Sequence, residues 1–190
     1  MLIGRYSAVL DACVLHPTFL RASLLWLATE RLYRPLWSEQ ILNEWEGSIR
    51  KKRPDISDSK LAQLRADFGA FPDAMVERSR ITLPDLTLSD PNDAHVIETG
   101  VLAHADAIIT ANLKHFPVSE LAKVGLEPIH PDTFLVNIID LDEVRALGSL
   151  RRQRQMMSRS EPTVDEFLAR FANCQLPQTY TRLKALRSLL

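Results

Sequence analysis

Residues 90–112 read DPNDAHVIETGVLAHADAIITAN, and this stretch decides the fold class. Its DPND start offers an acid as N-cap, Pro at the first helical position and a second acid in the first turn, which predicts a helix running to about His104. The run 107–110 then predicts a short strand buried on both faces, as in a parallel sheet. A helix that leads directly into such a strand predicts a βαβ unit.

The same pattern extends outward in both directions. Residues 8–10 form an apolar run that stops at Asp11, and residues 127–129 give a weaker strand candidate after Gly125. Strands that alternate with helices predict an α/β fold with a central parallel sheet.

Three further helices are predicted between the first two strands. The first opens at His16-Pro17 and closes before Pro35, because apolar residues recur there at helical spacing. The second follows Ser38 as N-cap and ends in the basic run 50–53, and the third starts after Ser57. Residues 73–77 are predicted to add a short turn.

The chain changes character after about Asp140, where helical patterning continues without a strand candidate. Segment 141–157, a capping box at 163–166 and a restart at Pro177 predict two or three helices. We therefore divide the chain into a domain at 1–139 and a helical extension at 140–190. The extension is expected to bury its large apolar side chains against each other or against a partner: Phe167, Phe171, Tyr180 and Leu183.

Composition excludes several classes of protein. The chain has 190 residues, 46% of them hydrophobic, and a formal net charge of −1, so any contact with nucleic acid must be local. Two separated cysteines, Cys13 and Cys174, argue against a disulfide framework or a zinc site, and Cys13 is expected to be a small buried filler. With neither a secretory signal nor a membrane span in the pattern, a cytoplasmic protein is expected.

Acidic side chains gather at one predicted edge of the sheet. Asp11 follows the first strand, and Asp90 and Asp93 begin the helix that enters the second, so all three belong at the carboxyl edge, where open sheets bind ligands. Glu44, in mid-helix beside Trp45, is expected to border the core and to need a partner or a metal. Clustered carboxylates predict a hard divalent ion, Mg²⁺ with Mn²⁺ as a substitute.

Each of these residues also has a structural explanation. Asp90 and Asp93 suit helix capping, Asp11 and Asn112 suit turns after strands, and Glu44 taken alone suits a solvated helix face. Residues 50–53 either form a solvated helix end or bind RNA phosphates. His95 is expected to be a satisfied, partly buried histidine.

Four segments in order resemble the motifs of the PIN domain family: VLD at 9–11, ILNEW at 41–45, DPNDAHVI at 90–97 and AIITANLKHF at 107–116. The likeness spans roughly residues 5–137. Within the family, the chain resembles the VapC-type toxin ribonucleases of bacterial toxin–antitoxin pairs. It implies a PIN-like α/β/α sandwich. It also implies catalytic roles for Asp11, Glu44, Asp93 and Asn112, and metal binding by Asp11, Glu44, Asp90 and Asp93. Apart from the resemblance, the basic run and the strand end predict RNA contacts by Arg50, Lys51, Lys52, Arg53 and Thr110.

The resemblance further implies a Mg²⁺-dependent endoribonuclease acting on tRNA or another structured RNA, inhibited by a small antitoxin protein, with a homodimer as one use of the helical extension. Two positions depart from the family pattern, because Asn112 and His115 stand where relatives often carry Asp. The alternative is therefore a catalytically degenerate PIN module that binds RNA or a protein partner without cutting.

Overall fold

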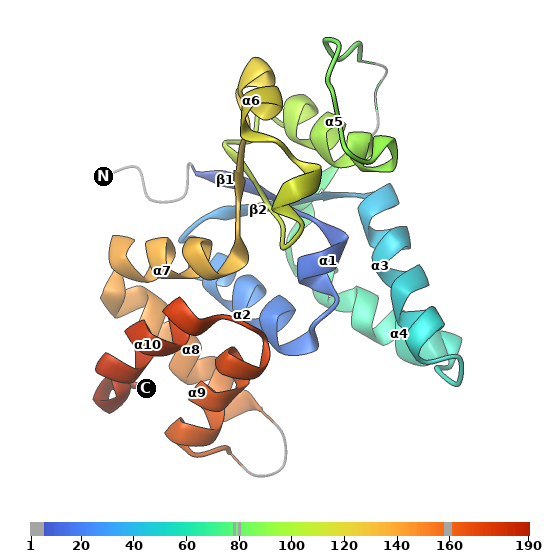
Figure 1. Cartoon of the computed structure of the whole chain (residues 1–190). Coiled ribbons are helices and arrows are strands. Elements are labelled where there is room, and N and C mark those ends of the chain that lie inside the picture. Colours follow the sequence, from blue (N-terminus) through green and yellow to red (C-terminus); the bar gives the residue numbers. More distant parts are fainter. Residues whose placement is uncertain (1–5, 78, 80, 158–160) are drawn as a thin grey trace.

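A five-stranded parallel sheet forms the centre of the molecule (Figure 1). The computed structural model describes residues 6–77, 79, 81–157 and 161–190. Its strands are β1 Ser7–Leu10, β2 Arg34–Ser38, β3 Met75–Val76, β4 Ala107–Ile109 and β5 Glu127–Ile129, in the order β3-β2-β1-β4-β5. All neighbouring strands run parallel, so the predicted α/β class is confirmed.

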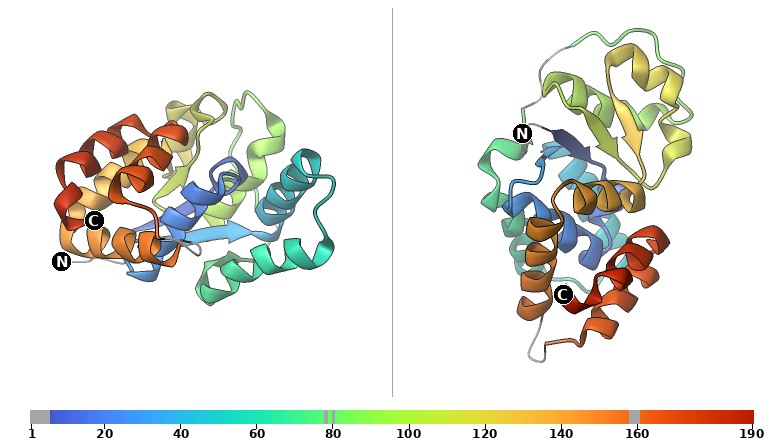
Figure 2. Two further views of the ribbon diagram at one scale, coloured as in Figure 1. Left: turned by 90° about the horizontal axis from the view of Figure 1, so that it is seen from below. Right: turned by 90° about the vertical axis from the view of Figure 1, so that its left-hand side faces the viewer.

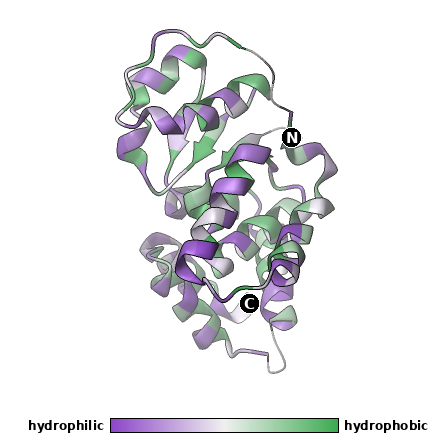
Figure 3. Cartoon of the chain, turned by 90° about the vertical axis from the view of Figure 1, so that its right-hand side faces the viewer, coloured by the Kyte–Doolittle hydropathy of each residue, from purple (hydrophilic) through white to green (hydrophobic). Residues whose placement is uncertain are grey.

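Helices flank the sheet and connect its strands. The first part of the chain contributes α1 Ala12–Leu15, α2 Thr18–Thr29, α3 Glu39–Lys52, α4 Asp58–Ala66, α5 Ala94–Leu102 and α6 Val118–Leu121. Helix α5 packs against β1, β2 and β4, whereas α2 packs against β2. The ribbon in Figure 3 carries both hydrophobic and hydrophilic colour along most helices, as expected of helices with one buried face.

Two strands were missing from the sequence prediction, which placed only helices and turns between the first two predicted strands. Strand β2 occupies 34–38, where Pro35 pairs with Ala8 of β1. Proline is unusual inside a sheet because it has no N–H to donate, so this segment does not look like a strand. Strand β3 has only two residues, too few for any periodic pattern, and follows a 3₁₀ turn at Pro72–Ala74.

The predicted helix starts are present, but helices also lie where none was predicted, at Val118–Leu121 and at Pro131–Leu141. The helix predicted to open at His16 is α2, and a separate short helix, α1, precedes it directly after Asp11. Ser38 accepts a hydrogen bond from the N–H of Ile41 and caps α3 as predicted. Asp90 accepts from the N–H of Asn92, but the first turn is a 3₁₀ turn before α5 begins at Ala94.

Helices α7 Pro131–Leu141, α8 Glu143–Met156, α9 Val164–Asn173 and α10 Pro177–Ala185 build the C-terminal part. They gather at one end of the molecule, with α8 packed on α2 and α10 packed on both α7 and α9 (Figures 1 and 2). The predicted capping box is present, because Thr163 and Glu166 bond to each other's backbone N–H. The division at 139/140 stays a prediction, and α7 runs across it.

Aromatic side chains attach this extension to the rest of the chain. Phe167 and Phe171 of α9 meet Phe19 of α2 edge to face, with ring centroids 5.4 and 4.8 Å apart. Both are fully buried, as is Leu183, while Tyr180 is partly buried. The expected apolar face is therefore covered within the chain. None of the described helices is long and apolar enough to cross a membrane.

Candidate metal centre

Asp11 lies at the carboxyl end of β1, where it begins α1. Its carboxylate is only 6% exposed, and its Oδ2 accepts a hydrogen bond from the hydroxyl of Thr110 at 2.7 Å. The thiol of Cys13 approaches the same oxygen at 3.0 Å. Two neutral donors from β1–α1 and from the end of β4 thus fix the direction in which the carboxylate points.

This arrangement changes the expected roles of both donors. Thr110 is fully buried, and its hydroxyl also accepts from the N–H of Asn112 at 3.0 Å, so its side chain positions Asp11, while its contact with RNA stays a prediction. Cys13 is more than a filler, because burial and the neighbouring Asp11 charge raise the pKa of its thiol to about 12 and keep it protonated as a donor.

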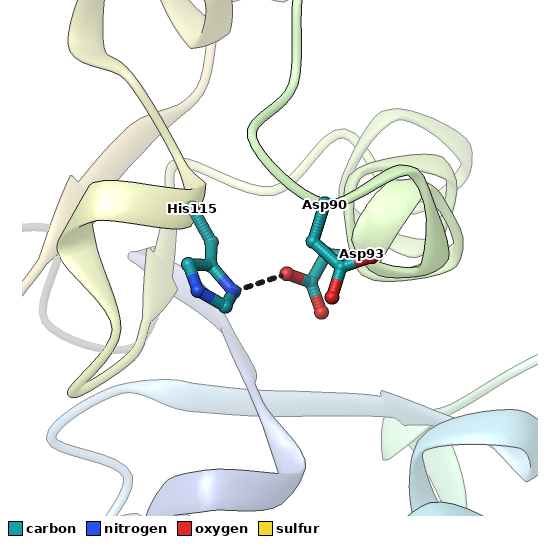
Figure 4. Close-up of side chains that lie close together, drawn as sticks. All are labelled: Asp90, Asp93 and His115. Carbon is teal, nitrogen blue, oxygen red and sulfur yellow. Dashed lines mark hydrogen bonds and ion pairs between the residues drawn. The ribbon is translucent and has the colours of Figure 1, made fainter.

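Asp90, Asp93 and His115 form a compact cluster beside this edge (Figure 4). One potential ligand atom from each residue lies within 4.8 Å of the others. The Nδ1 atom of His115 is 2.8 Å from Oδ2 of Asp93. The cluster joins the start of α5 to the 3₁₀ turn Leu113–His115 after β4, two segments that the parallel sheet brings to one edge.

Burial and nearby acids both act on the pKa of the Asp93 carboxyl. Burial raises the pKa of its carboxyl, and the negative charges of Asp11 and Asp90 raise it further, whereas the hydrogen bond from His115 opposes them. The pKa as a whole lies above its usual range. The charges of Asp11 and Asp90 therefore act against the charge of Asp93, and a cation would relieve that repulsion.

Glu44 reaches the same region from α3 but is half exposed, at 49% of its side chain, so it does not border the core as predicted. Its Oε2 is 3.4 Å from Nε2 of the buried His95, whose Nδ1 is 2.7 Å from the carbonyl oxygen of Asn92. Burial would lower the pKa of His95, but Glu44, the Asn92 carbonyl and the charge of Asp11 together raise it. His95 therefore stands between Glu44 and the Asp11 side of the site.

The remaining predicted site residues lie around this core. Asn112 is exposed directly after β4 and begins the turn that carries His115. The basic run is exposed at the end of α3, where Arg50 pairs with Asp58 at 2.7 Å and Arg53 pairs with Asp55 at 3.3 Å. A neighbouring pocket of ≈ 570 Å³ opens between α3, β3 and α5, with His95 in its lining.

The structure brings Asp90 and Asp93 together at the predicted edge and adds His115 to them. His95 is buried with its Nδ1 atom 2.7 Å from the carbonyl oxygen of Asn92, which agrees with the expected partly buried histidine, whereas the sequence pattern marks His115 only as a departure from an acidic position. The signal for His115 was its position before a buried aromatic, Phe116, in a segment that returns to the carboxyl edge. Nothing in the local sequence indicated that its ring would face Asp93.

This arrangement of acids at the end of a parallel sheet agrees with the comparison with known families. A family model described as "PIN domain" matches residues 7–114, which is more than half of the chain. The chain therefore belongs to the PIN domain family. Its C-terminal helices match a second family model, described as "VapC50 C-terminal domain", over residues 131–185.

A similar individual protein is described as "Putative ribonuclease VapC50" from Mycobacterium tuberculosis (strain ATCC 25618 / H37Rv). It is 43% identical over 51 residues, which cover 27% of this chain and 30% of that protein. The match thus spans less than a third of the relative's length. No solved structure matches the chain.

Proposed function

We propose that this protein is a divalent-metal-dependent endoribonuclease and the toxin of a toxin–antitoxin pair. The observation that carries the proposal is the cluster of Asp90, Asp93 and His115 at the carboxyl edge of the sheet in a PIN domain, where the charge of Asp11 also acts on Asp93. The name of the similar protein, a ribonuclease, supports the choice of RNA.

The donor set fits Mg²⁺ or Mn²⁺. Carboxylate oxygens are the ligands that hard divalent ions prefer, and the pKa of Asp93 is raised first by burial and then by the charges of Asp11 and Asp90. Asp11, Asp90 and Asp93 would hold the ion, and Glu44 would join them from α3. When bound, such an ion supplies a water of lowered pKa and stabilises charge on the scissile phosphate.

The chain's own residues would orient the site and the substrate. Thr110 and Cys13 hold Asp11 in place, and His95 holds Glu44 toward the site. Lys51 and Lys52 are exposed on the same helix as Glu44 and offer positive charge to the RNA backbone, with Arg50 and Arg53 beside them. The pocket lined by His95 would offer room for a nucleotide of the substrate.

The first experiment is incubation of the purified protein with total RNA and Mg²⁺. Discrete fragments are expected, and they should disappear with chelator and in Asp11→Asn and Asp93→Asn. Asp165→Asn is the matched control, because this acid is exposed on α9 and pairs with Arg187 at 2.9 Å. Equal cleavage by Asp11→Asn and the control would reject the assignment of the site.

Structured RNA such as tRNA is the proposed substrate, and a small antitoxin protein is the proposed inhibitor. Expression of the chain alone should arrest bacterial growth, and co-expression of a small protein encoded beside it should restore growth. Sequencing of the cleaved RNA ends would identify the target. Arrest that persists in Asp11→Asn would disconnect toxicity from the acidic site.

A non-cutting PIN module is the second candidate, favoured by one observation. The Asp93 carboxylate already has a partner in His115 at 2.8 Å, so the histidine is able to substitute for a cation. Calorimetric titration with Mn²⁺ distinguishes the two candidates. Binding that is lost in Asp11→Asn supports the nuclease, whereas absence of binding supports the non-cutting module.

A further inference from the structure

His115 is the residue of the cluster that an all-oxygen Mg²⁺ site would not need. Its side chain and that of Asp93 are only 25% and 17% exposed, so the pair sits inside the edge of the sheet. Figure 4 shows the imidazole and both carboxylates pointing into one shared space. Three side chains with lone pairs therefore converge from two separate segments.

We propose that His115 is a nitrogen ligand of the metal ion, which makes the centre a mixed nitrogen–oxygen site with a preference for Mn²⁺ over Mg²⁺. The inference rests on the proposed metal-dependent function and adds an identified ligand and a metal preference to it. Imidazole suits first-row transition ions, whereas Mg²⁺ is held almost entirely by oxygen.

The distances suit shared coordination. Adjacent ligands of an octahedral ion with bonds of about 2.1 Å lie about 3 Å apart. The Nδ1 atom of His115 and Oδ2 of Asp93 are 2.8 Å apart, and an Asp90 ligand atom completes a set that spans at most 4.8 Å. A single ion is able to bridge all three with small adjustments of side-chain torsion.

The backbone holds His115 in this position before any ion binds. Its N–H donates to the carbonyl oxygen of Asn112 at 2.8 Å, which closes the 3₁₀ turn after β4. The next residue, Phe116, is 1% exposed and anchors the turn in the core. Preorganisation of this kind is what a metal ligand requires.

Charge explains why a nitrogen ligand would change the metal preference. His115 and Asn112 add no negative charge to that of Asp90 and Asp93. Mg²⁺ binding depends strongly on carboxylate charge, while a transition ion gains from the imidazole donor. A site in which imidazole takes the place of a further carboxylate therefore favours Mn²⁺ over Mg²⁺.

The experiment uses Mn²⁺ as the probe and the full chain at pH 8. Electron spin-echo spectroscopy of bound Mn²⁺ should show modulation from a directly coordinated ¹⁴N nucleus. His115→Asn should abolish that modulation, because its amide is able to donate to Asp93 but does not supply an imidazole nitrogen. His104→Asn is the control, since His104 is exposed beyond α5 at φ 50°, a conformation that Asn tolerates.

The affinity for Mn²⁺ gives a second measurement. The direction in which it changes in a His115 variant distinguishes a metal ligand from a residue that only pairs with Asp93. As a ligand, His115 stabilises Mn²⁺, so His115→Ala should weaken Mn²⁺ about tenfold, and His115→Asp should raise Mg²⁺ affinity relative to Mn²⁺. As a mere partner of Asp93, it competes with the ion, so His115→Ala would bind Mn²⁺ more tightly. That tightening, or ¹⁴N modulation persisting in His115→Asn, would overturn the proposal.

Two outcomes keep this inference separate from the proposed function. Mn²⁺ that binds and depends on Asp11, but shows no nitrogen coupling, would overturn the role of His115 and leave the metal-dependent function standing. Absence of Mn²⁺ binding to the wild-type chain would overturn both. Unfolding curves of each variant in metal-free buffer identify any loss of binding that comes from loss of structure.

Discussion

Two buried carboxylates in this protein serve opposite purposes. Asp132, on α7, is 2% exposed and accepts hydrogen bonds from the N–H of Gln178, the N–H of Thr179 and the hydroxyl of Thr179, all within 2.9 Å. Asp11, at the end of β1, is 6% exposed, but the hydrogen bonds it receives from described residues go to Oδ2 alone.

The two aspartates differ in how many of their carboxylate oxygens accept hydrogen bonds. Asp132 uses both oxygens to cap α10, so its charge stabilises the packing of the C-terminal helices. Asp11 keeps Oδ1 without a hydrogen bond from the described residues, and its charge raises the pKa of Asp93. A saturated carboxylate maintains the fold, whereas an unsaturated one among other acids is suited to binding a cation.

The largest expected effect is on RNA cleavage, where the two aspartates should differ. Asp11→Asn should lower RNA cleavage about 10³-fold, roughly 4 kcal/mol of transition-state stabilisation, because the proposed metal loses a ligand. The Asp132→Asn variant should cleave RNA at the wild-type rate at temperatures where the variant is folded. Initial rates on one RNA with saturating Mg²⁺ test both, and equal loss in the two variants would contradict the distinction.

The second effect is on the free energy of unfolding, where the Asp132 substitution should have the larger effect. Asp132→Asn should lower the free energy of unfolding by about 3 kcal/mol, because an amide group would face backbone donors that need an acceptor. Asp11→Asn should leave it unchanged or raise it in metal-free buffer, since one of several repelling charges is removed. Urea unfolding measures both, with Asp140→Asn on α7 as the exposed control.

Metal addition should sharpen the same contrast. Mg²⁺ at 100 times its Kd is expected to stabilise the wild-type chain by about 2.7 kcal/mol, because it binds only the folded state. Asp132→Asn should gain the same increment, whereas Asp11→Asn should gain almost none. Thermal melts with Mg²⁺ and with chelator provide the measurement, and a full gain in Asp11→Asn would place the metal elsewhere.

The smallest effect is confined to the C-terminal helices. Thr163→Ala removes the side-chain cap of α9 and should destabilise the chain by about 1 kcal/mol, without altering metal affinity. Thr181→Ala is a suitable control, because this exposed hydroxyl bonds only to the carbonyl oxygen of Pro177 within its own helix. A change in Mn²⁺ affinity in Thr163→Ala would show that the two regions are coupled.

How far the sequence predicted the fold depended on the length of each pattern. Strands β1, β4 and β5 were predicted because each joins apolar residues to a recognisable turn or acid. Strand β2 was hidden by Pro35, and β3 by its two-residue length. Both were recognisable only through their pairing with neighbours, which is a tertiary property.

The site divides in the same way. Sequence by itself determined that acids would collect at the carboxyl edge, because strand ends and helix starts in a parallel sheet share that edge. Only the tertiary structure decided which neighbours each acid would have: Thr110 and Cys13 on Asp11, His95 on Glu44, and His115 on Asp93. Spacing along the chain determines the edge, but side-chain directions depend on packing between segments as much as 99 residues apart.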